Sequence, residues 1–569
     1  MSTSAPPPPP TLLDHLAASL RSGIPGKHAY SLHVVRSQSR RSYALFPHAS
    51  NAKSCRIWQE EVLVVLSEDR DAPQDPPAAP HEPPKESADA PVASTSTTTP
   101  PSSSSIKRSS VPVVGIEASI YTIPSTSTSL LYISKVDTTG LSPSSSPSPT
   151  RTLVASFLSY HLLHPPHGTE RLRIHVFARA QGQYLFPGSV ENKSKRVLDD
   201  KGLIRWWKGT VERATRDAEV QKMLQRGTEQ LKMFYLIPGL TYLESLPYVP
   251  VPPPSAAAST PSPTWTYGHP YSVLPSPLHR APSSLSPTAA AQHPLTDHLP
   301  SFPDDPKSRF LHSLTSSSLS PSGTSGDYDD VFLALHSSTF TTGQTPAARL
   351  AEVEKERERE RKRLVEGVQG GVDEWWERMA FRQECCSGVL VGFFVVALEP
   401  VPASPSAHPP PSTTADCPAP SDAAPSPTSM TSSSTSHPHV HAPQKIPMSL
   451  PNPLFTKLWS QFHNVDYSLP ALPKLFEASQ KWAEDVERLV KLEEAEAEAD
   501  EGSQKDTNEK GGLGEEELQR RFEGEVSRRV EVDNPELVKE KRDAPGGAAG
   551  EGEKPKVNTL APRKKKKVA

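Results

Sequence analysis

The stretch GIEASIYTIPSTSTSLLYISKV, residues 115–136, decides the fold class. Ile116, Ala118 and Ile120 occupy every second position, and a second apolar run follows over 130–136 after a Ser/Thr-rich turn. A period of two places one face of each segment against a core, and two such runs joined by a short turn predict a hairpin. We therefore expect a sheet with at least one antiparallel pair of strands.

Segments further along the chain predict more strands and a helix. Residues 171–180 alternate in the same way, and residues 389–398 form a continuous apolar run, which is typical of a strand buried on both faces. Apolar residues recur at steps of three and four over 200–226, which predicts an amphipathic helix with Asp199 or Asp200 as its cap. Because strands and helices do not alternate regularly, we expect an α+β or a mixed α/β layered domain.

Composition divides the chain into apolar segments and blocks rich in Pro, Ser and Thr. Proline makes up 64 of the 569 residues, against a usual share of about 5%. Such blocks lack the apolar content that offsets the entropy of ordering, so we expect disorder at about 70–110, 141–150, 249–300, 313–326 and 400–446. The remaining residues predict a core over 11–399, a helical segment over 448–495 that packs on it, and a charged tail over 496–569.

Bulk properties exclude several classes of protein. A formal net charge of −4 does not favour nucleic-acid binding, and four cysteines without a metal-ligand spacing indicate a reducing compartment and no zinc site. The polar N-terminus predicts no secretory signal, and the longest apolar run is far shorter than the roughly 20 residues that span a bilayer. We expect a soluble intracellular protein without a Walker loop, a nucleophile elbow or a dinucleotide fingerprint.

The motif FPDDPKSRF, residues 302–310, has two interpretations. Asp304 and Asp305 could supply a general base and its electrostatic support, because Pro306 restricts the backbone of Asp305 to extended conformations. Alternatively, an aspartate followed by proline is an ordinary helix start, with the aspartate as cap and proline at the first helical position. The residues alone leave both interpretations open.

Two further motifs predict a site for an anionic ligand. Residues 177–207 carry an aromatic, glycine-bearing loop, the basic tetrad KSKR (193–196) and two adjacent tryptophans. Clustered cations suit the phosphates of a nucleotide-like cofactor, although a solvated loop is the alternative. The motif SKVDTTG (134–140) ends a strand before a helix, where an anion site or a plain turn is possible. Trp206 and Trp207 cannot both face the core of one helix, so one is expected to line a pocket.

Several other patterns carry less information. The charged segment 348–367 is typical of a solvated helix. His437, His439 and His441 lie in a Pro/Ser block and are not expected to bind a metal. Cys385 and Cys386 precede an apolar strand and are expected in the core. The run PRKKKKV, residues 562–568, is typical of a nuclear import signal, with phosphate contact as the alternative.

The motifs over 134–140, 183–207, 299–314 and 381–384, together with the closing NTLAPRKKKK, resemble the fungal-specific family of histone H3 lysine acetyltransferases known as the regulator of Ty transposition family. The order of the motifs matches as well. The resemblance implies a mixed α/β fold similar to the CBP-type acetyltransferase domain, with a central mixed sheet enclosed by helices. It also implies direct transfer of acetyl from acetyl-CoA without a metal. It further implies a nuclear protein that acetylates H3 in H3–H4, assisted by chaperones of the NAP and anti-silencing-function types, in replication-coupled nucleosome assembly and the DNA damage response.

By motif position, the resemblance also implies site residues. Asp305 corresponds to the acid/base, Asp304 to its neighbour and Lys307 to an autoacetylated lysine, while Asp137, Tyr184 and Trp207 correspond to residues that line the active site. The implied acetyl-CoA contacts are Val136, Asp137, Thr138, Arg151, Phe177, Gln181, Arg196, Val197, Leu198 and Trp206.

Two other functions fit the same residues. A chromatin scaffold that has lost turnover would bind histones or chaperones and need not retain acetyl-CoA binding. An acyltransferase for non-histone substrates would bind the cofactor without a preference for H3. No sequence-specific DNA binding and no membrane contact is expected.

Overall fold

The computed structural model describes residues 9–49, 55–71, 108–142, 148–250, 264–279, 294–315, 371–382, 389–401, 446–503 and 514–535, and a few residues between 355 and 368. Several predictions lie outside these residues: most of the expected disordered blocks, most of the charged segment 348–367, the three histidines at 437–441, Cys385, Cys386 and the basic run 562–568.

Ten strands of the described residues form one mixed sheet. They are β1 (Gly26–Arg36), β2 (Arg40–Ser42), β3 (Ile57–Asp71), β4 (Arg108–Ile123), β5 (Thr128–Thr138), β6 (Arg171–Arg179), β7 (Glu229–Leu236), β8 (Trp265–Tyr267), β9 (Val391–Pro400) and β10 (Ser527–Asn534). Their order is β10-β1-β3-β4-β5-β6-β9-β7-β8, with β2 paired to β3. The β5–β6 and β7–β8 pairs are parallel, and the other pairs of the sheet are antiparallel.

The expected hairpin is β4–β5 at the centre of this sheet. Ile116, Ala118 and Ile120 are buried in the largest apolar cluster together with Leu131 and Ile133 of the partner strand. The period of two in the sequence therefore selects the face that packs against helices.

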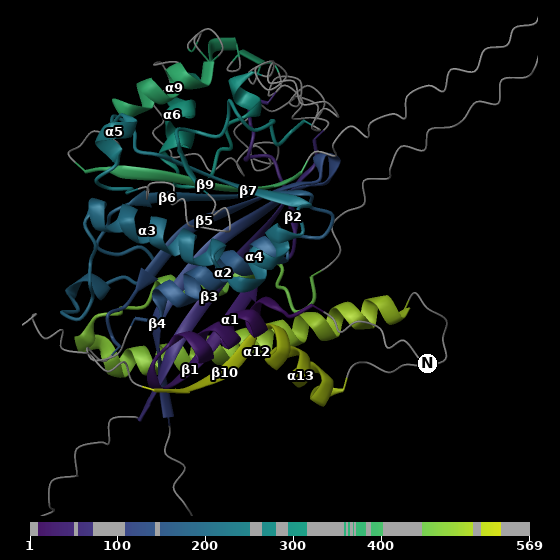
Figure 1. The fold of residues 1–569 in the computed structure, drawn as a ribbon. Coiled ribbons are helices and arrows are strands. Elements are labelled where there is room, and N and C mark those ends of the chain that lie inside the picture. Colours follow the sequence, from purple (N-terminus) through teal and green to yellow (C-terminus); the bar gives the residue numbers. More distant parts are fainter. Residues whose placement is uncertain are drawn as a thin grey trace, which may run out of the picture.

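One face of the sheet is covered by α1 (Leu12–Gly23), α2 (Thr150–Leu163), α3 (Asp200–Thr215) and α4 (Ala218–Gln225) (Figure 1). The single helix expected over 200–226 is wrong, because the structure has two. Asp217 accepts hydrogen bonds from the N–H groups of Glu219 and Val220, and this cap starts a new helix after Arg216. Asp199, one of the two expected caps, accepts from Gly202 N at 2.7 Å at the start of α3.

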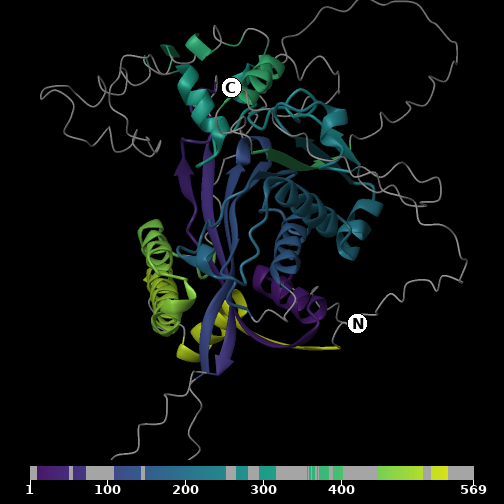
Figure 2. The ribbon, with the colours of Figure 1, turned by 90° about the vertical axis from the view of Figure 1, so that its left-hand side faces the viewer.

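The opposite face is covered by α11 (Asn452–His463) and α12 (Leu472–Ser503), which appear on the other side of the sheet in Figure 2. Leu458 of α11 and Val486 of α12 share one apolar cluster with Val35 and Val65 of the sheet. Segment 448–495 thus lies on the sheet through an apolar interface. The remaining helices are α5 (Tyr242–Ser245), α6 (Pro306–Thr315), α9 (Gly371–Ala380) and α13 (Glu515–Glu525); α6 and α9 share a cluster around buried Trp375.

Two expected boundaries differ from the structure. Residues 264–279 and 294–300, expected within a disordered block, are placed: β8 extends the sheet, and Tyr271, Leu274 and Leu299 are buried. The expected charged tail contains β10, which pairs with β1 at the sheet edge. Val530 and Val532 lie on the buried face of β10. Charged residues surround them, so the average composition of this segment is that of a solvated tail and does not indicate a strand.

The expected fold class, a mixed α/β fold with a central mixed sheet between helices, is confirmed. Within the described part of the chain, no helix combines the length and apolar character required to cross a membrane.

Leu458→Ala tests the packing of α11 on the sheet. Leu458 is 1% exposed, so the truncation removes buried apolar surface, leaves a cavity, and is expected to lower the free energy of unfolding by about 2–5 kcal/mol in a urea titration. Leu492→Ala is the control, because Leu492 of α12 is 48% exposed. Equal effects of the two substitutions would contradict a buried interface at α11.

Candidate cofactor and substrate site

A cavity of about 840 Å³ opens where the parallel strands β5 and β6 end. The carboxyl ends of neighbouring parallel strands meet at one edge of a sheet, and ligands of α/β proteins commonly bind there. The starts of α2 and α3 and the loop between β6 and α3 complete the walls. Twelve residues predicted from the sequence line this cavity: Val136, Asp137, Thr138, Arg151, Phe177, Gln181, Tyr184, Arg196, Val197, Leu198, Trp206 and Trp207.

Asp137, at the end of β5, organises the cavity wall. Its Oδ2 accepts hydrogen bonds from the backbone N–H groups of Tyr184, Leu185 and Phe186 at 2.7, 2.9 and 3.3 Å. Its Oδ1 accepts from Thr138 N and from Lys195 Nζ, both at 2.8 Å. A carboxylate that is 5% exposed and holds five donors fixes the loop after β6. This geometry supports a positioning role for Asp137.

Lys195, in the basic tetrad, is the cation of this network. Its side chain is 4% exposed, and it donates to Asp137 and, at 2.7 Å, to Ser189 Oγ. Burial lowers the pKa of Lys195, and the neighbouring Asp137 opposes that shift. Gly140 has φ +69°, and a Cβ there would lie 2.5 Å from the backbone nitrogen of Lys195, so the close approach of the two loops requires glycine.

Tyr184 and the two tryptophans form the less polar wall. The hydroxyl of Tyr184 donates to Arg179 O and accepts from Gln181 N at 2.9 Å, and burial raises the pKa of the phenol to about 12. Trp206 and Trp207 meet edge to face, with ring centroids 5.0 Å apart. Trp207 is 5% exposed within the main core and Trp206 is partly buried, yet both line the cavity.

The charges of the cavity suit an anionic ligand. Seven cationic side chains line it: Lys135, Arg151, Arg179, Lys195, Arg196, Arg205 and Arg213. The carboxylate that lines it, that of Asp137, is already occupied by five donors. In addition, α2 begins at the cavity without a side-chain cap at Pro149, so N–H groups of its first turn are directed at the same space. These features fit the phosphates and pyrophosphate of acetyl-CoA.

Asp305 and Lys307 do not line this cavity. Asp305 is fully buried at the start of α6, where its Oδ1 accepts from Lys307 N at 2.9 Å and its Oδ2 pairs with Lys307 Nζ. The cap interpretation of Asp305 is therefore confirmed, and its acid/base role stays a prediction. Asp304 is exposed and has φ +57°.

An aromatic contact joins this ion pair to the cavity. Lys307 Nζ lies 4.7 Å from the ring centroid of Phe393, and Phe393 stacks on Phe177, which lines the cavity, at 4.9 Å. The buried His175 also lies near this pair, and its pKa is well below the usual value because of burial and the charge of Lys307. The second region is thus separated from the cavity by two stacked rings.

Asn192 and the residues around Tyr467 were missed in the sequence. Asn192 Nδ2 donates to Thr139 O at 2.7 Å and Tyr467 O at 2.8 Å, and Leu469 N donates to Asn192 Oδ1 at 2.7 Å. Tyr467 N donates to Pro187 O at 2.8 Å. Residues 467–469 therefore clamp the loop that Asp137 holds from inside. The sequence carries one signal for this role, namely that Asn192 directly precedes the basic tetrad.

Fold and site together define a mixed α/β protein with a cation-lined cavity at the ends of β5 and β6. The family model of the histone acetyltransferase KAT11-type domain matches residues 145–484, more than half of the sequence, and the chain belongs to this family. The family expected from the motifs is thus confirmed.

Named relatives and a solved structure agree with this assignment. The chain is similar to histone acetyltransferase rtt109 of Aspergillus flavus (31% identity over 302 residues, 51% of this chain and 45% of that protein). It is also similar to histone acetyltransferase rtt109 of Schizosaccharomyces pombe (26% over 309 residues, 52% and 58%). It therefore spans about half the length of these curated relatives. The crystal structure of Rtt109 from Aspergillus fumigatus shares the fold, with a TM-score of 0.51, 22% identity and coverage of 91% of this chain and 99% of that one.

Asn192→Ala tests the clamp on the cavity loop. The substitution leaves the buried carbonyls of Thr139 and Tyr467 without this donor, so the amides of residues 184–186 are expected to exchange hydrogen faster by about tenfold, corresponding to roughly 1–3 kcal/mol for an unsatisfied buried group. Asn464→Ala is the matched control, because the side chain of Asn464 is exposed. Unchanged exchange in Asn192→Ala would show that Asp137 alone fixes the loop.

Proposed function

We propose that the chain is a nuclear lysine acetyltransferase that transfers acetyl from acetyl-CoA directly to histone H3 within H3–H4. The observation that carries this proposal is the convergence of the twelve predicted lining residues in one cation-rich cavity of a KAT11-type chain. Relatives named histone acetyltransferase support the substrate class. Assistance by NAP-type and anti-silencing-function-type chaperones, and a role in replication-coupled nucleosome assembly and the DNA damage response, belong to the same proposal through the family resemblance.

The residues of the cavity have separate tasks under this proposal. Arg151, Arg196 and the start of α2 hold the phosphates, because charge-assisted hydrogen bonds are stronger and more directional than neutral ones. When bound, acetyl-CoA supplies the acetyl group as an activated thioester. Tyr184 and Trp207 form an apolar wall for the substrate lysine.

The substrate lysine must lose a proton before it reacts. Deprotonation at pH 7 costs about 4.6 kcal/mol from a pKa of about 10.4. An apolar wall lowers that pKa by desolvation, and a carboxylate accepts the proton. The role proposed for Asp305 as this acceptor requires its ion pair with Lys307 to open, since both oxygens are engaged by Lys307. It also requires the stacked rings of Phe177 and Phe393 to separate, since Asp305 is fully buried behind them.

Arg196→Gln tests the cofactor site. Loss of the guanidinium is expected to weaken acetyl-CoA binding about tenfold in a calorimetric titration, as for removal of a charge-assisted phosphate contact of roughly 1.5–3 kcal/mol. Lys193→Gln in the same tetrad is the control, because Lys193 is exposed and does not line the cavity. Equal losses in both variants would indicate a general effect of loop charge and would contradict a specific phosphate contact. A chain that binds no acetyl-CoA would favour the scaffold alternative.

Asp305→Asn tests the proton acceptor with labelled acetyl-CoA and H3–H4 supplied with chaperone. We expect the transfer rate to fall by about a hundredfold while acetyl-CoA still binds. The variant also leaves Lys307 buried without its carboxylate, which is expected to cost about 3–5 kcal/mol of stability. The double variant Asp305→Asn/Lys307→Gln removes both charges and is expected to regain stability.

The double variant separates the two roles of Asp305. A rate that stays low after stability has returned supports proton acceptance. A rate that returns together with stability would contradict it and assign Asp305 to holding Lys307 and α6 in place. Acetylation of a non-histone lysine substrate as fast as that of H3–H4 would instead support the non-histone acyltransferase alternative.

A further inference from the structure

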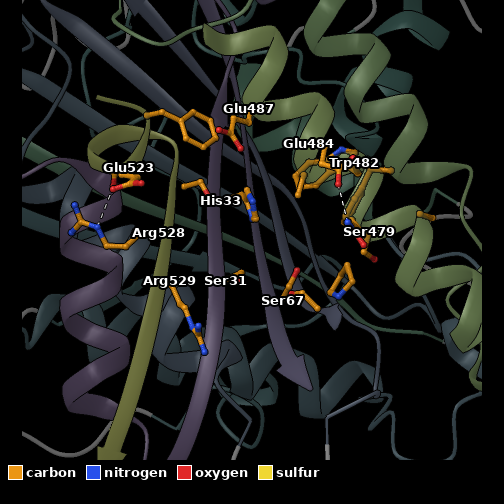
Figure 3. A pocket seen from close by; sticks show the side chains of 18 of the residues that line it. Ser31, His33, Ser67, Ser479, Trp482, Glu484, Glu487, Glu523, Arg528 and Arg529 are labelled. Carbon is orange, nitrogen blue, oxygen red and sulfur yellow. Dashed lines mark hydrogen bonds between the residues drawn. The ribbon is translucent and has the colours of Figure 1, made fainter. Parts of the chain in front are cut away.

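A second cleft, of about 920 Å³, lies on the sheet face that α11 and α12 cover. Figure 3 shows Ser31, His33 and Ser67 on the strands, with Trp482, Glu484 and Glu487 of α12 opposite them. α13 and β10 close the other side. None of the residues predicted for the cofactor or the reaction lines this cleft.

The cleft exists because the sheet face changes character along the strands. Val35 of β1 and Val65 of β3 pack against the helices in an apolar cluster. Two to four residues along the same strands, this face carries Ser31, His33 and Ser67, whose small or polar side chains offer no apolar surface for the helices to bury. The sheet therefore presents polar groups to an open space between two layers.

Three buried polar atoms at the cleft have no hydrogen-bond partner among the described residues: His33 Nδ1, Ser110 Oγ and Ser479 Oγ. His33 is 7% exposed and meets the Trp482 ring edge to face at 5.4 Å. Burial lowers the pKa of His33 to about 4, so its imidazole is neutral at pH 7 and combines one donor with one acceptor. Buried polar groups usually have partners, so these three atoms mark the cleft wall as polar and incompletely satisfied.

The charges around the cleft leave carboxylates without cations. The three arginines that line it already have carboxylate partners: Arg520 pairs with Glu517, Arg528 with Asp14 at 2.5 Å, and Arg529 with Asp69 at 3.3 Å. By contrast, among the described residues Glu484 accepts from Gln480 at 2.8 Å and Glu523 from Gln519 at 2.5 Å, both neutral amides. Glu487 has Lys491 at 2.6 Å. The cleft therefore favours a cationic ligand.

We propose that this cleft binds a lysine- or arginine-bearing segment of a partner protein. Cationic side chains of the segment face Glu484 and Glu523, and its apolar parts contact Trp482 and Phe462. The source of the segment rests on the function proposed above, because histones supply such basic segments, whereas the binding itself does not depend on acetyl transfer.

One segment links the cleft to the cofactor cavity. Phe462 and Tyr467 line the cleft, and the backbone of Tyr467 bonds to Pro187 and Asn192 in the loop that Asp137 holds. A protein held in the cleft thus contacts the same segment that clamps the cavity loop.

The test uses the full chain without acetyl-CoA at low salt. A fluorescein-labelled nonapeptide with three lysines and no acidic residue is expected to bind in fluorescence anisotropy, and its lysine-to-glutamine counterpart is not. Glu484→Gln/Glu523→Gln is expected to weaken binding about fivefold to tenfold, because each exposed ion pair contributes modestly. Glu496→Gln, an exposed residue of the same helix outside the cleft, is the control and is expected to change nothing.

Ala483→Trp fills the cleft and is expected to abolish binding while acetyl-CoA binding persists. Absence of peptide binding, an equal effect of Glu496→Gln, or unchanged affinity in Ala483→Trp would overturn the proposal. Tighter peptide binding after replacement of lysines 564–567 by glutamine would identify the chain's own basic run as the occupant and likewise overturn it. A chain that binds the peptide but transfers no acetyl group refutes only the proposed function, and the reverse result refutes only this inference.

Discussion

The carboxylate of Asp137 is the constraint on which the candidate site depends. It stands at the end of β5, 5% exposed, and holds five donors, three of them consecutive backbone N–H groups after β6. A buried charge persists only when its hydrogen-bonding capacity is met, so the loop and the carboxylate require each other. Tyr184 lines the cavity from this loop. Lys195 belongs to the basic tetrad that also contains Arg196, and its ion pair with Asp137 joins the tetrad to the same network.

The same loop is supported from outside by a segment far along the chain. Asn192 and Tyr467 are 275 residues apart in sequence and share a hydrogen bond of 2.8 Å. His463 Nδ1 lies 3.0 Å from Leu185 O, and Trp459 Nε1 donates to Glu117 at 2.8 Å beside the Lys135–Glu117 ion pair. α11 is therefore both a cover for the sheet and part of the cavity's support, and it lies within the matched KAT11-type region, which extends to residue 484.

Local patterns in the sequence predicted the elements whose burial repeats at short range. The alternation over 115–136 predicted the β4–β5 hairpin, whereas the twelve residues that line one cavity were implied by the family resemblance of the motifs. Predictions of secondary structure failed where a single capping residue or a partner far along the chain determines the element. Asp217 splits the expected helix over 200–226, and β10 is recognisable as a strand only through its pairing with β1. Asn192 illustrates the limit for the site, because its three partners lie in two other segments of the chain.

Net charge illustrates a further limit, since the formal −4 conceals how charges are distributed in space. Seven cationic side chains line the cofactor cavity, together with the carboxylate of Asp137, which already accepts five hydrogen bonds. In the cleft, the three arginines form ion pairs with carboxylates. Among the described residues, Glu484 and Glu523 accept hydrogen bonds from neutral amides. Exposed charges are screened beyond about 8–10 Å at physiological salt. A ligand at either site therefore experiences the electrostatic field of the nearby side chains and not the net charge of the whole chain. Tyr467 links the two sites, because it lines the cleft and its backbone bonds to Pro187 and Asn192 in the loop that Asp137 holds.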